Sequence, residues 1–134
     1  MNYQDQVVVL TGASGGIGSA MAKKFTDLGA KVALLDITVD RVQALADKLG
    51  LGSDRAFCAA VDVSNEESVK ATVDAIVKHF GRIDVLVNAA GIPGPSARVE
   101  DYSFSDAKKV LSVNLFGTFL MMHTVLPVMQ AQKH

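Results

Sequence analysis

Short apolar runs alternate along this chain with longer segments in which apolar residues recur every three or four positions. The short runs are rich in Val, Leu and Ala and lack polar alternation, which is typical of strands buried on both faces of a sheet. Four strands are predicted, over residues 6–10, 31–36, 55–61 and 83–87. Amphipathic helices are predicted between them, over residues 16–28, 38–49 and 64–80.

The strict alternation of strands and helices predicts an α/β fold with a doubly wound parallel sheet and helices on both faces. Connections of helix length make right-handed crossovers the expected connection. The 134 residues contain no internal repeat, linker or low-complexity segment. Residues 1–134 are therefore expected to form a single domain.

Capping residues set the expected helix ends. Gly29 and Gly50 are expected to stop the first two helices, and Thr38 is expected to cap the second. The sequence Ser64-Asn65-Glu66-Glu67 has the form of a capping box. In such a box the Ser64 hydroxyl and a Glu carboxylate satisfy free N–H groups at the helix start.

A last helix is expected over about residues 105–130, after a Gly/Pro-bearing loop at 91–101. Gly117 and Pro127 lie within it and predict a kink or break. Residues 110–129 carry no charged side chain and are numerous enough to span a membrane. Because this stretch includes several polar side chains, we favour a helix buried in protein or at an interface over a membrane span.

Composition narrows the range of partners. Hydrophobic residues make up 49% and charged residues 20% of the chain, as in folded globular proteins. A net charge of −1 gives no electrostatic reason to expect nucleic acid or an anionic membrane as a partner. The single cysteine excludes an internal disulfide, which suits a cytoplasmic location. One cysteine and three scattered histidines do not form a metal-binding pattern.

The chemistry begins in the loop after the first predicted strand, Thr11-Gly-Ala-Ser-Gly-Gly-Ile-Gly18. Its glycines allow a tight turn and a close approach of the backbone to a pyrophosphate, and the following helix presents N–H groups to the phosphates. The loop residues expected to bind the cofactor are Gly12, Ser14, Gly15, Gly16, Ile17 and Gly18.

Asp36 ends the second predicted strand, 18 residues after Gly18. A carboxylate there can accept hydrogen bonds from the adenosine ribose and would repel a 2′-phosphate. The adjacent Ile37 and Thr38 supply no compensating cation, so NAD is expected rather than NADP. The alternative is that Asp36 merely precedes the helix cap at Thr38.

With these motifs the chain resembles the short-chain dehydrogenase/reductase family, from Val7 to about Met129. Three further motifs carry the resemblance: Asp62-Val63, Asn88-Ala89-Ala90-Gly91 and Leu111–Thr118, the last of which contains Asn114. The resemblance implies the strand order 3-2-1-4. It also implies that Asp62 and the Val63 backbone meet the adenine, that Asn88 ties the fourth strand to its neighbour, and that Gly91 passes near the second ribose. Ala89 and Ala90 belong to the same cofactor-binding segment, and Ala89 stands where many family members carry a second Asn.

The catalytic groups that the family uses are only partly represented. The family employs a Ser, a Tyr and a Lys four residues after that Tyr, with an Asn that orders a water chain. Asn114 matches this Asn, and its structural alternative is a polar side chain that satisfies backbone groups at a helix kink. The chain's two tyrosines, Tyr3 and Tyr102, are followed four residues later by Val7 and Asp106. A phenol without an adjacent cation is a poor base at neutral pH.

The leading hypothesis is therefore an NAD(H)-binding half-domain that is not an active dehydrogenase alone. The alternatives are an oxidoreductase completed by another subunit or using an unconventional site, and a truncated product that folds without function. In the order 3-2-1-4 the fourth strand would be a sheet edge, and such an edge invites pairing with another chain. A homodimer or larger oligomer is expected, through this edge, the last helix, or both.

Overall fold

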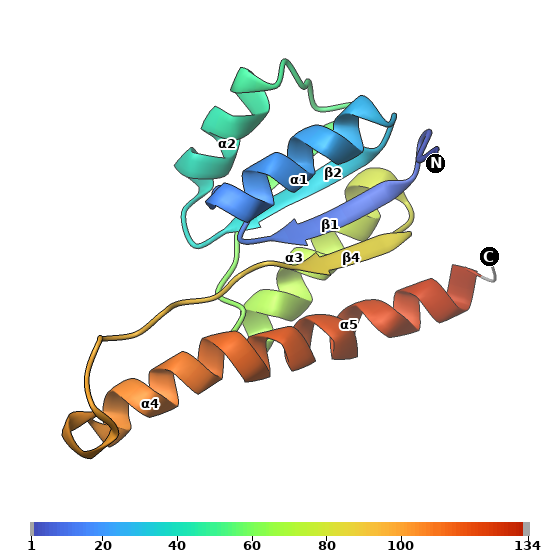
Figure 1. Cartoon of the computed structure of the whole chain (residues 1–134). Helices are drawn as coiled ribbons and strands as arrows, with labels where there is room; N and C mark the ends of the chain where they lie inside the picture. The colour runs from blue at the N-terminus through green and yellow to red at the C-terminus, as the bar shows by residue number, and fades with distance from the viewer. Residues whose placement is uncertain (1, 133–134) are drawn as a thin grey trace.

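The computed structural model describes residues 2–132 and shows a four-stranded, fully parallel sheet in the order β3-β2-β1-β4 (Figure 1). The doubly wound fold and its strand order are thus confirmed. The strands are β1 Val7–Thr11, β2 Lys31–Asp36, β3 Ala56–Ala60 and β4 Val85–Asn88. The helices are α1 Gly16–Asp27, α2 Val39–Lys48, α3 Glu66–Phe80, η1 Val99–Asp101, α4 Phe104–Leu111, η2 Ser112–Phe116 and α5 Gly117–Gln132.

Two apolar layers hold the helices to the sheet. Alternate residues of β1 point to opposite faces, so Val8 and Leu10 pack with α1 and α2, while Val7 and Val9 pack with α3 and α5. Met121 of α5 is fully buried in the second layer. The strands β1 and β2 are buried almost throughout. In contrast, β3 and β4 are largely half-buried because they form the sheet edges, which corrects the expectation of strands buried on both faces.

The helix caps differ in detail from the sequence expectation. Asn65, and not Ser64, caps α3, because its side-chain oxygen accepts a hydrogen bond from the Ser68 N–H at 2.8 Å. The Ser64 hydroxyl instead donates to Asp62 at 2.6 Å. Thr38 occupies the N-cap position of α2 without a side-chain capping hydrogen bond. The predicted helix starts are therefore right to within two residues, and the capping group of α3 is corrected.

The irregularity expected in the last helix lies at η2, a π-helical turn between α4 and α5. No break occurs at Pro127, because α5 continues through it to Gln132. Gly117 follows the π turn, and a Cβ on it would lie 2.6 Å from Cγ2 of Val63. This close approach seats α5 against the segment after β3, and it places the π turn beside the carboxyl ends of the strands.

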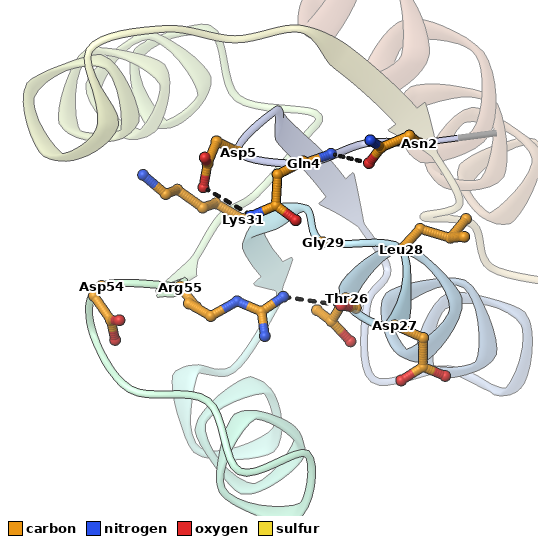
Figure 2. Close-up of a pocket in the computed structure, with 10 residues that line it drawn as sticks. All are labelled: Asn2, Gln4, Asp5, Thr26, Asp27, Leu28, Gly29, Lys31, Asp54 and Arg55. Atoms are coloured by element: carbon orange, nitrogen blue, oxygen red, sulfur yellow. Dashed lines mark hydrogen bonds between the residues drawn. The ribbon is translucent and has the colours of Figure 1, made fainter.

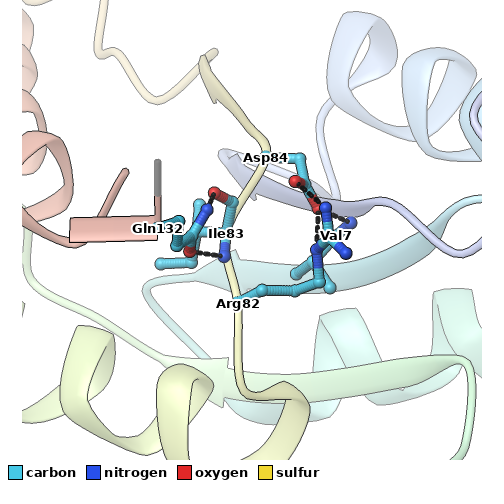
Figure 3. Close-up of polar contacts among 5 residues, drawn as sticks. All are labelled: Val7, Arg82, Ile83, Asp84 and Gln132. Carbon is cyan, nitrogen blue, oxygen red and sulfur yellow. Dashed lines mark hydrogen bonds and ion pairs between the residues drawn. The ribbon is translucent and has the colours of Figure 1, made fainter. Parts of the chain in front are cut away.

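A polar cluster anchors the start of β4 (Figure 3). Asp84 accepts a hydrogen bond from the Val7 N–H at 2.8 Å. Its carboxylate also accepts from Nη2 and Nε of Arg82, at 2.5 and 2.8 Å. The Gln132 carboxamide accepts from the Ile83 N–H at 2.7 Å and donates to the Ile83 carbonyl at 2.8 Å. The end of α5 is thereby fixed beside the start of β4.

Replacing the central acceptor of this cluster tests its contribution to folding. We expect Asp84→Ala to lower the free energy of unfolding by about 1–3 kcal/mol, because a buried N–H and a guanidinium lose their acceptor. The matched control is Lys70→Ala, which removes an exposed ion pair with Asp74 and should cost about 0.5 kcal/mol or less. Urea denaturation measures both. Equal effects of the two variants would contradict the anchoring role.

Candidate functional site

The carboxyl ends of the strands open into one cavity of about 620 Å³. Crevices at this end of a doubly wound sheet are where ligands bind in such folds. Ten of the fourteen residues expected to bind cofactor line it: Gly12, Ser14, Gly15, Asp36, Ile37, Asp62, Val63, Ala89, Ala90 and Gly91. The other four, Gly16, Ile17, Gly18 and Asn88, lie outside the lining set.

At the glycine loop, the backbone of Gly12 lies so close to the backbone of Ala89 that no side chain fits between them. Gly12 has a φ of +63°, and a Cβ built on it would lie 2.5 Å from the Ala89 carbonyl oxygen. A Cβ at Gly18 would overlap the Gly12 carbonyl oxygen. These two glycines therefore do not need to contact a ligand to matter, because they set the path of the loop between β1 and α1.

The Thr11 hydroxyl fastens the two strand ends that flank the cavity. It accepts hydrogen bonds from the Ala89 and Ala90 N–H groups, both at 3.2 Å, and its residue is 1% exposed. Asn88 is the register partner of Thr11 across β1 and β4. The side-chain hydrogen bonds identified at this junction come from Thr11, and the role that the resemblance implies for Asn88 stays a prediction.

The start of α1 offers backbone donors to a ligand. Gly15 is its N-cap residue and makes no side-chain capping hydrogen bond. Gly15 lines the cavity, and a Cβ on Gly16 would meet nothing within 4 Å, so open space adjoins the first turn. An uncapped helix N-terminus with open space before it suits the phosphates of a dinucleotide. Ile17 lies on this turn with 76% of its surface exposed.

Asp36 is connected to the glycine loop by direct hydrogen bonds. Its Oδ2 accepts from both the N–H and the hydroxyl of Ser14, and its Oδ1 accepts from the Ile37 N–H at 2.7 Å. Partial burial by itself would raise the pKa of Asp36, but these hydrogen bonds outweigh it. With the nearby charge of Arg41 they hold the Asp36 pKa below its ordinary value. The carboxylate is therefore ionised at neutral pH.

Two cations reach the cavity from helices on either side of it. Arg41 comes from α2 and Lys109 from α4, and both line the cavity. The sequence motifs point to neither residue, since Arg41 lies five residues beyond Asp36 and becomes its neighbour only through the turn into α2. The sequence signal that could have indicated Arg41 is its position in the first turn of the predicted helix that follows Asp36.

Asp62 and Val63 occupy the same wall of the cavity with different surroundings. Val63 is 6% exposed and packs on α5, whereas Asp62 is exposed at the rim. The Asp62 Oδ1 accepts from the N–H and the hydroxyl of Ser64, at 3.0 and 2.6 Å. These contacts fix the carboxylate at the mouth of the cavity, where one oxygen faces Ser64.

Asn114 lies in the π turn and is bound to the loop after β4. Its Oδ1 accepts from the Ile92 N–H at 2.7 Å, and its Nδ2 donates to the Ile92 carbonyl at 2.8 Å. A Cβ on Gly91 would lie 3.2 Å from the same Oδ1. The amide thus satisfies backbone groups, as the structural alternative for Asn114 expects. Its partner Ile92 and its neighbour Val113 line the cavity, whereas Asn114 itself is not among the lining residues.

Among the described residues, acid–base groups of the tyrosine type do not converge on the cavity. Tyr3 packs edge-on against Phe25 in the α1 layer. Tyr102 packs against the loop near Gly94, where its hydroxyl fills the space of a Cβ. The described part of the chain also contains no cluster of three His, Cys, Asp or Glu side chains that could hold a metal ion.

A second hollow, of about 810 Å³, lies at the amino ends of the strands (Figure 2). Arg55, which lines it together with Lys31, donates to the backbone carbonyls of Thr26 and Ala30, at 2.9 and 3.0 Å. These bonds satisfy backbone carbonyls at the end of α1 and in the turn after it. Although it is larger, the hollow contains neither the glycine loop nor Asp36, so the cavity at the carboxyl ends is the candidate site.

Known proteins share this arrangement. The sequence profile of the short chain dehydrogenases matches residues 6–134. The D-threitol dehydrogenase of Mycolicibacterium smegmatis is 43% identical over 122 residues, which cover 90% of this chain and 46% of that protein.

Solved structures agree closely in fold. A short chain dehydrogenase/reductase from Burkholderia phymatum in complex with NAD superposes with a TM-score of 0.92 at 31% identity, over 100% of this chain and 47% of that one. An NAD⁺-bound xylitol dehydrogenase gives a TM-score of 0.91 at 35% identity, over 100% of this chain and 52% of that one.

The chain thus spans about half the length of the curated relatives it matches. Within that half, the profile match, the sequence identity and the shared fold agree with the glycine loop and the placement of Asp36. The chain belongs to the short-chain dehydrogenase family.

Proposed function

We propose that this chain binds NAD(H) in the cavity at the carboxyl ends of its strands. The observation that carries the proposal is the uncapped start of α1 opening beside an ionised Asp36 in one cavity. The first group suits a pyrophosphate and the second suits ribose hydroxyls. Asp62 and Val63 then lie where an adenine would extend. The printed descriptions of related structures name NAD and NADH as their bound ligands.

The same proposal assigns no dehydrogenase activity to the chain alone. The described residues correspond to the adenine-binding part of a dinucleotide fold. Both polar atoms of the Asn114 side-chain amide are hydrogen-bonded to the Ile92 backbone. Hydride transfer requires the nicotinamide and substrate to be fixed in near-attack geometry. In this proposal the described residues hold the adenosine part of the cofactor, and no described tyrosine lies at the cavity to act on the nicotinamide side.

A second candidate function is that of an oxidoreductase completed by another polypeptide. One observation favours it: β4 has a single neighbour in the sheet of the described residues. In that case Asn114 and the cofactor cavity belong to a site whose acid–base residues come from elsewhere. The substrate would be read by that second polypeptide.

We further propose that the chain is a cytoplasmic homodimer. One helix of the described chain, Phe104–Gln132, is long and apolar enough to cross a membrane, but α5 also packs on the sheet through Met121 and Val125. Its outer side carries an apolar stripe of exposed residues at helical spacing: Leu111, Leu115, Phe119, Met122 and Leu126. Such a stripe at spacings of three and four residues is what a partner helix packs against.

Titration with NADH tests the main proposal. We expect saturable binding by calorimetry, with a dissociation constant below about 1 mM, or better than about −4 kcal/mol. Gly18→Val should abolish NADH binding, because the valine side chain would overlap the Gly12 carbonyl and displace the loop. Lys70→Ala is the control, since Lys70 is exposed on α3 and does not line the cavity. Absence of heat up to millimolar NADH would refute the proposal.

Removing the negative charge of Asp36 tests the preference for NADH over NADPH. We expect Asp36→Ala to weaken NADH binding about tenfold, through loss of charged hydrogen bonds, and to strengthen NADPH binding. The gain for NADPH should vanish in Asp36→Ala/Arg41→Ala, since Arg41 then supplies the cation for the 2′-phosphate. Asp40→Ala, an exposed neighbour outside the cavity, should leave both ligands unchanged. An unchanged NADH/NADPH ratio in Asp36→Ala would contradict the assignment.

Light scattering at micromolar concentration tests the dimer. We expect a mass of twice 14.2 kDa for the chain and a shift to monomer in Phe119→Glu, because a charge in the stripe cannot be desolvated at the interface. Lys78→Glu, on the exposed side of α3, should remain dimeric. A clean monomer for the unaltered chain would remove the proposal.

A further inference from the structure

One ionisable side chain, His123, lies on the outer face of α5 that carries the apolar stripe. Residues 110–129 contain no Asp, Glu, Lys or Arg, and His123 is their only titratable residue. The His123 ring stacks on the ring of Phe119, with centroids 5.5 Å apart and an interplanar angle of 21°. Because Phe119 belongs to the stripe, His123 lies on the same face of the helix.

The neighbours of His123 on this face are apolar and exposed. His123 is itself exposed, and Met122 before it and Leu126 one turn later each have 45% of their surface exposed. Residues three and four apart adjoin each other on a helix surface. A second copy of the chain packed on the stripe would therefore cover the His123 ring together with these side chains.

Among the described residues, the elements packed against α5 bring no carboxylate to His123. α5 packs on α3, β4 and η2, and neither β4 nor η2 contains a titratable side chain. α3 enters the layer that it shares with α5 through apolar side chains such as Val73 and Ile76. The charged and titratable side chains of α3 are all exposed, and they are Glu66, Glu67, Lys70, Asp74, Lys78 and His79.

The charges on the helix that leads to His123 are distant and positive. Lys109 of α4 is the nearest charged residue before His123, 14 residues or roughly four helical turns away. A lysine at that position could not neutralise an imidazolium. A proton added to His123 would therefore place an unpaired charge on an otherwise uncharged surface.

The cost of that charge depends on whether the stripe is covered. Histidine is the side chain whose charge ordinarily changes between about pH 5 and 8. A neutral imidazole is far easier to cover than an imidazolium, because an unpaired buried charge loses its hydration without compensation. In a dimer with two-fold symmetry both copies place the same residue in the interface, so protonation introduces two such charges. The separate copies keep both charges in water.

We propose that His123 makes the homodimer sensitive to pH: the dimer forms while both imidazoles are neutral and separates when they are protonated, below about pH 6. The inference rests on the homodimer proposed above and does not involve dinucleotide binding. Separation takes up one proton for each copy. Raising the pH removes these protons and restores the dimer.

Light scattering of the unaltered chain, over a concentration series and without dinucleotide, tests the inference between about pH 7.5 and about pH 5.5. We expect a dimer at the upper pH. At the lower pH the dimer dissociation constant should rise at least about tenfold for each copy, or about a hundredfold in all. Circular dichroism at each pH checks that the helices remain intact.

Two histidine variants provide the matched comparison. His123→Gln keeps a polar side chain that cannot gain a proton, so it should remain dimeric at both pH values. His79→Gln removes a histidine from the exposed side of α3, where its ring bonds the Ser53 carbonyl at 2.7 Å. This control should separate at the lower pH as the unaltered chain does.

The possible outcomes separate this inference from the homodimer proposal. An unaltered chain that stays dimeric at both pH values would overturn the inference and leave the homodimer standing. Equal acid separation of His123→Gln and the unaltered chain would also overturn it, because another group would then be responsible. A monomer at the upper pH would refute the homodimer and the inference together.

Discussion

The site depends on one contact between backbones, the approach of Gly12 to the Ala89 carbonyl at the carboxyl ends of β1 and β4. A Cβ on Gly12 would lie 2.5 Å from that oxygen, and the left-handed φ of +63° favours glycine independently. The buried Thr11 hydroxyl holds the same junction by accepting two N–H groups. With the junction closed, α1 starts at the cavity rather than behind it, and Ser14 can bond Asp36. The backbone N–H groups at the start of α1 and the Asp36 carboxylate are thus brought together.

Much of this could be predicted because local chemistry determines it. The buried strands β1 and β2 and the loop between β1 and α1 follow from apolar runs and glycine spacing, and Asp36 follows from its place at a strand end. Arg41 and Lys109 could not be found in the same way, since their approach depends on how α2 and α4 sit on the sheet. Asn65 caps α3 in place of Ser64, because the Ser64 hydroxyl is hydrogen-bonded to the Asp62 carboxylate.

The last helix shows how tertiary packing overrides a local signal. Proline disfavours a helix interior, yet α5 continues through Pro127, with Met121 and Val125 fully buried on one side and Gln132 fixed to Ile83 at its end. The irregularity moves instead to the π turn, where Asn114 can hold the Ile92 backbone. The same helix leaves an apolar stripe outside and an open β4 edge beside it. The described residues therefore combine a closely packed core with an exposed apolar surface on the last helix.

Amide chemical-shift mapping with NADH tests the central claim most directly, because it locates the ligand residue by residue. The account predicts that the largest shifts fall on the glycine loop, on Asp36 and Ile37, and on Val63, at the carboxyl ends of the strands. Shifts centred on the opposite hollow, around Thr26, Gly29 and Arg55, would contradict it.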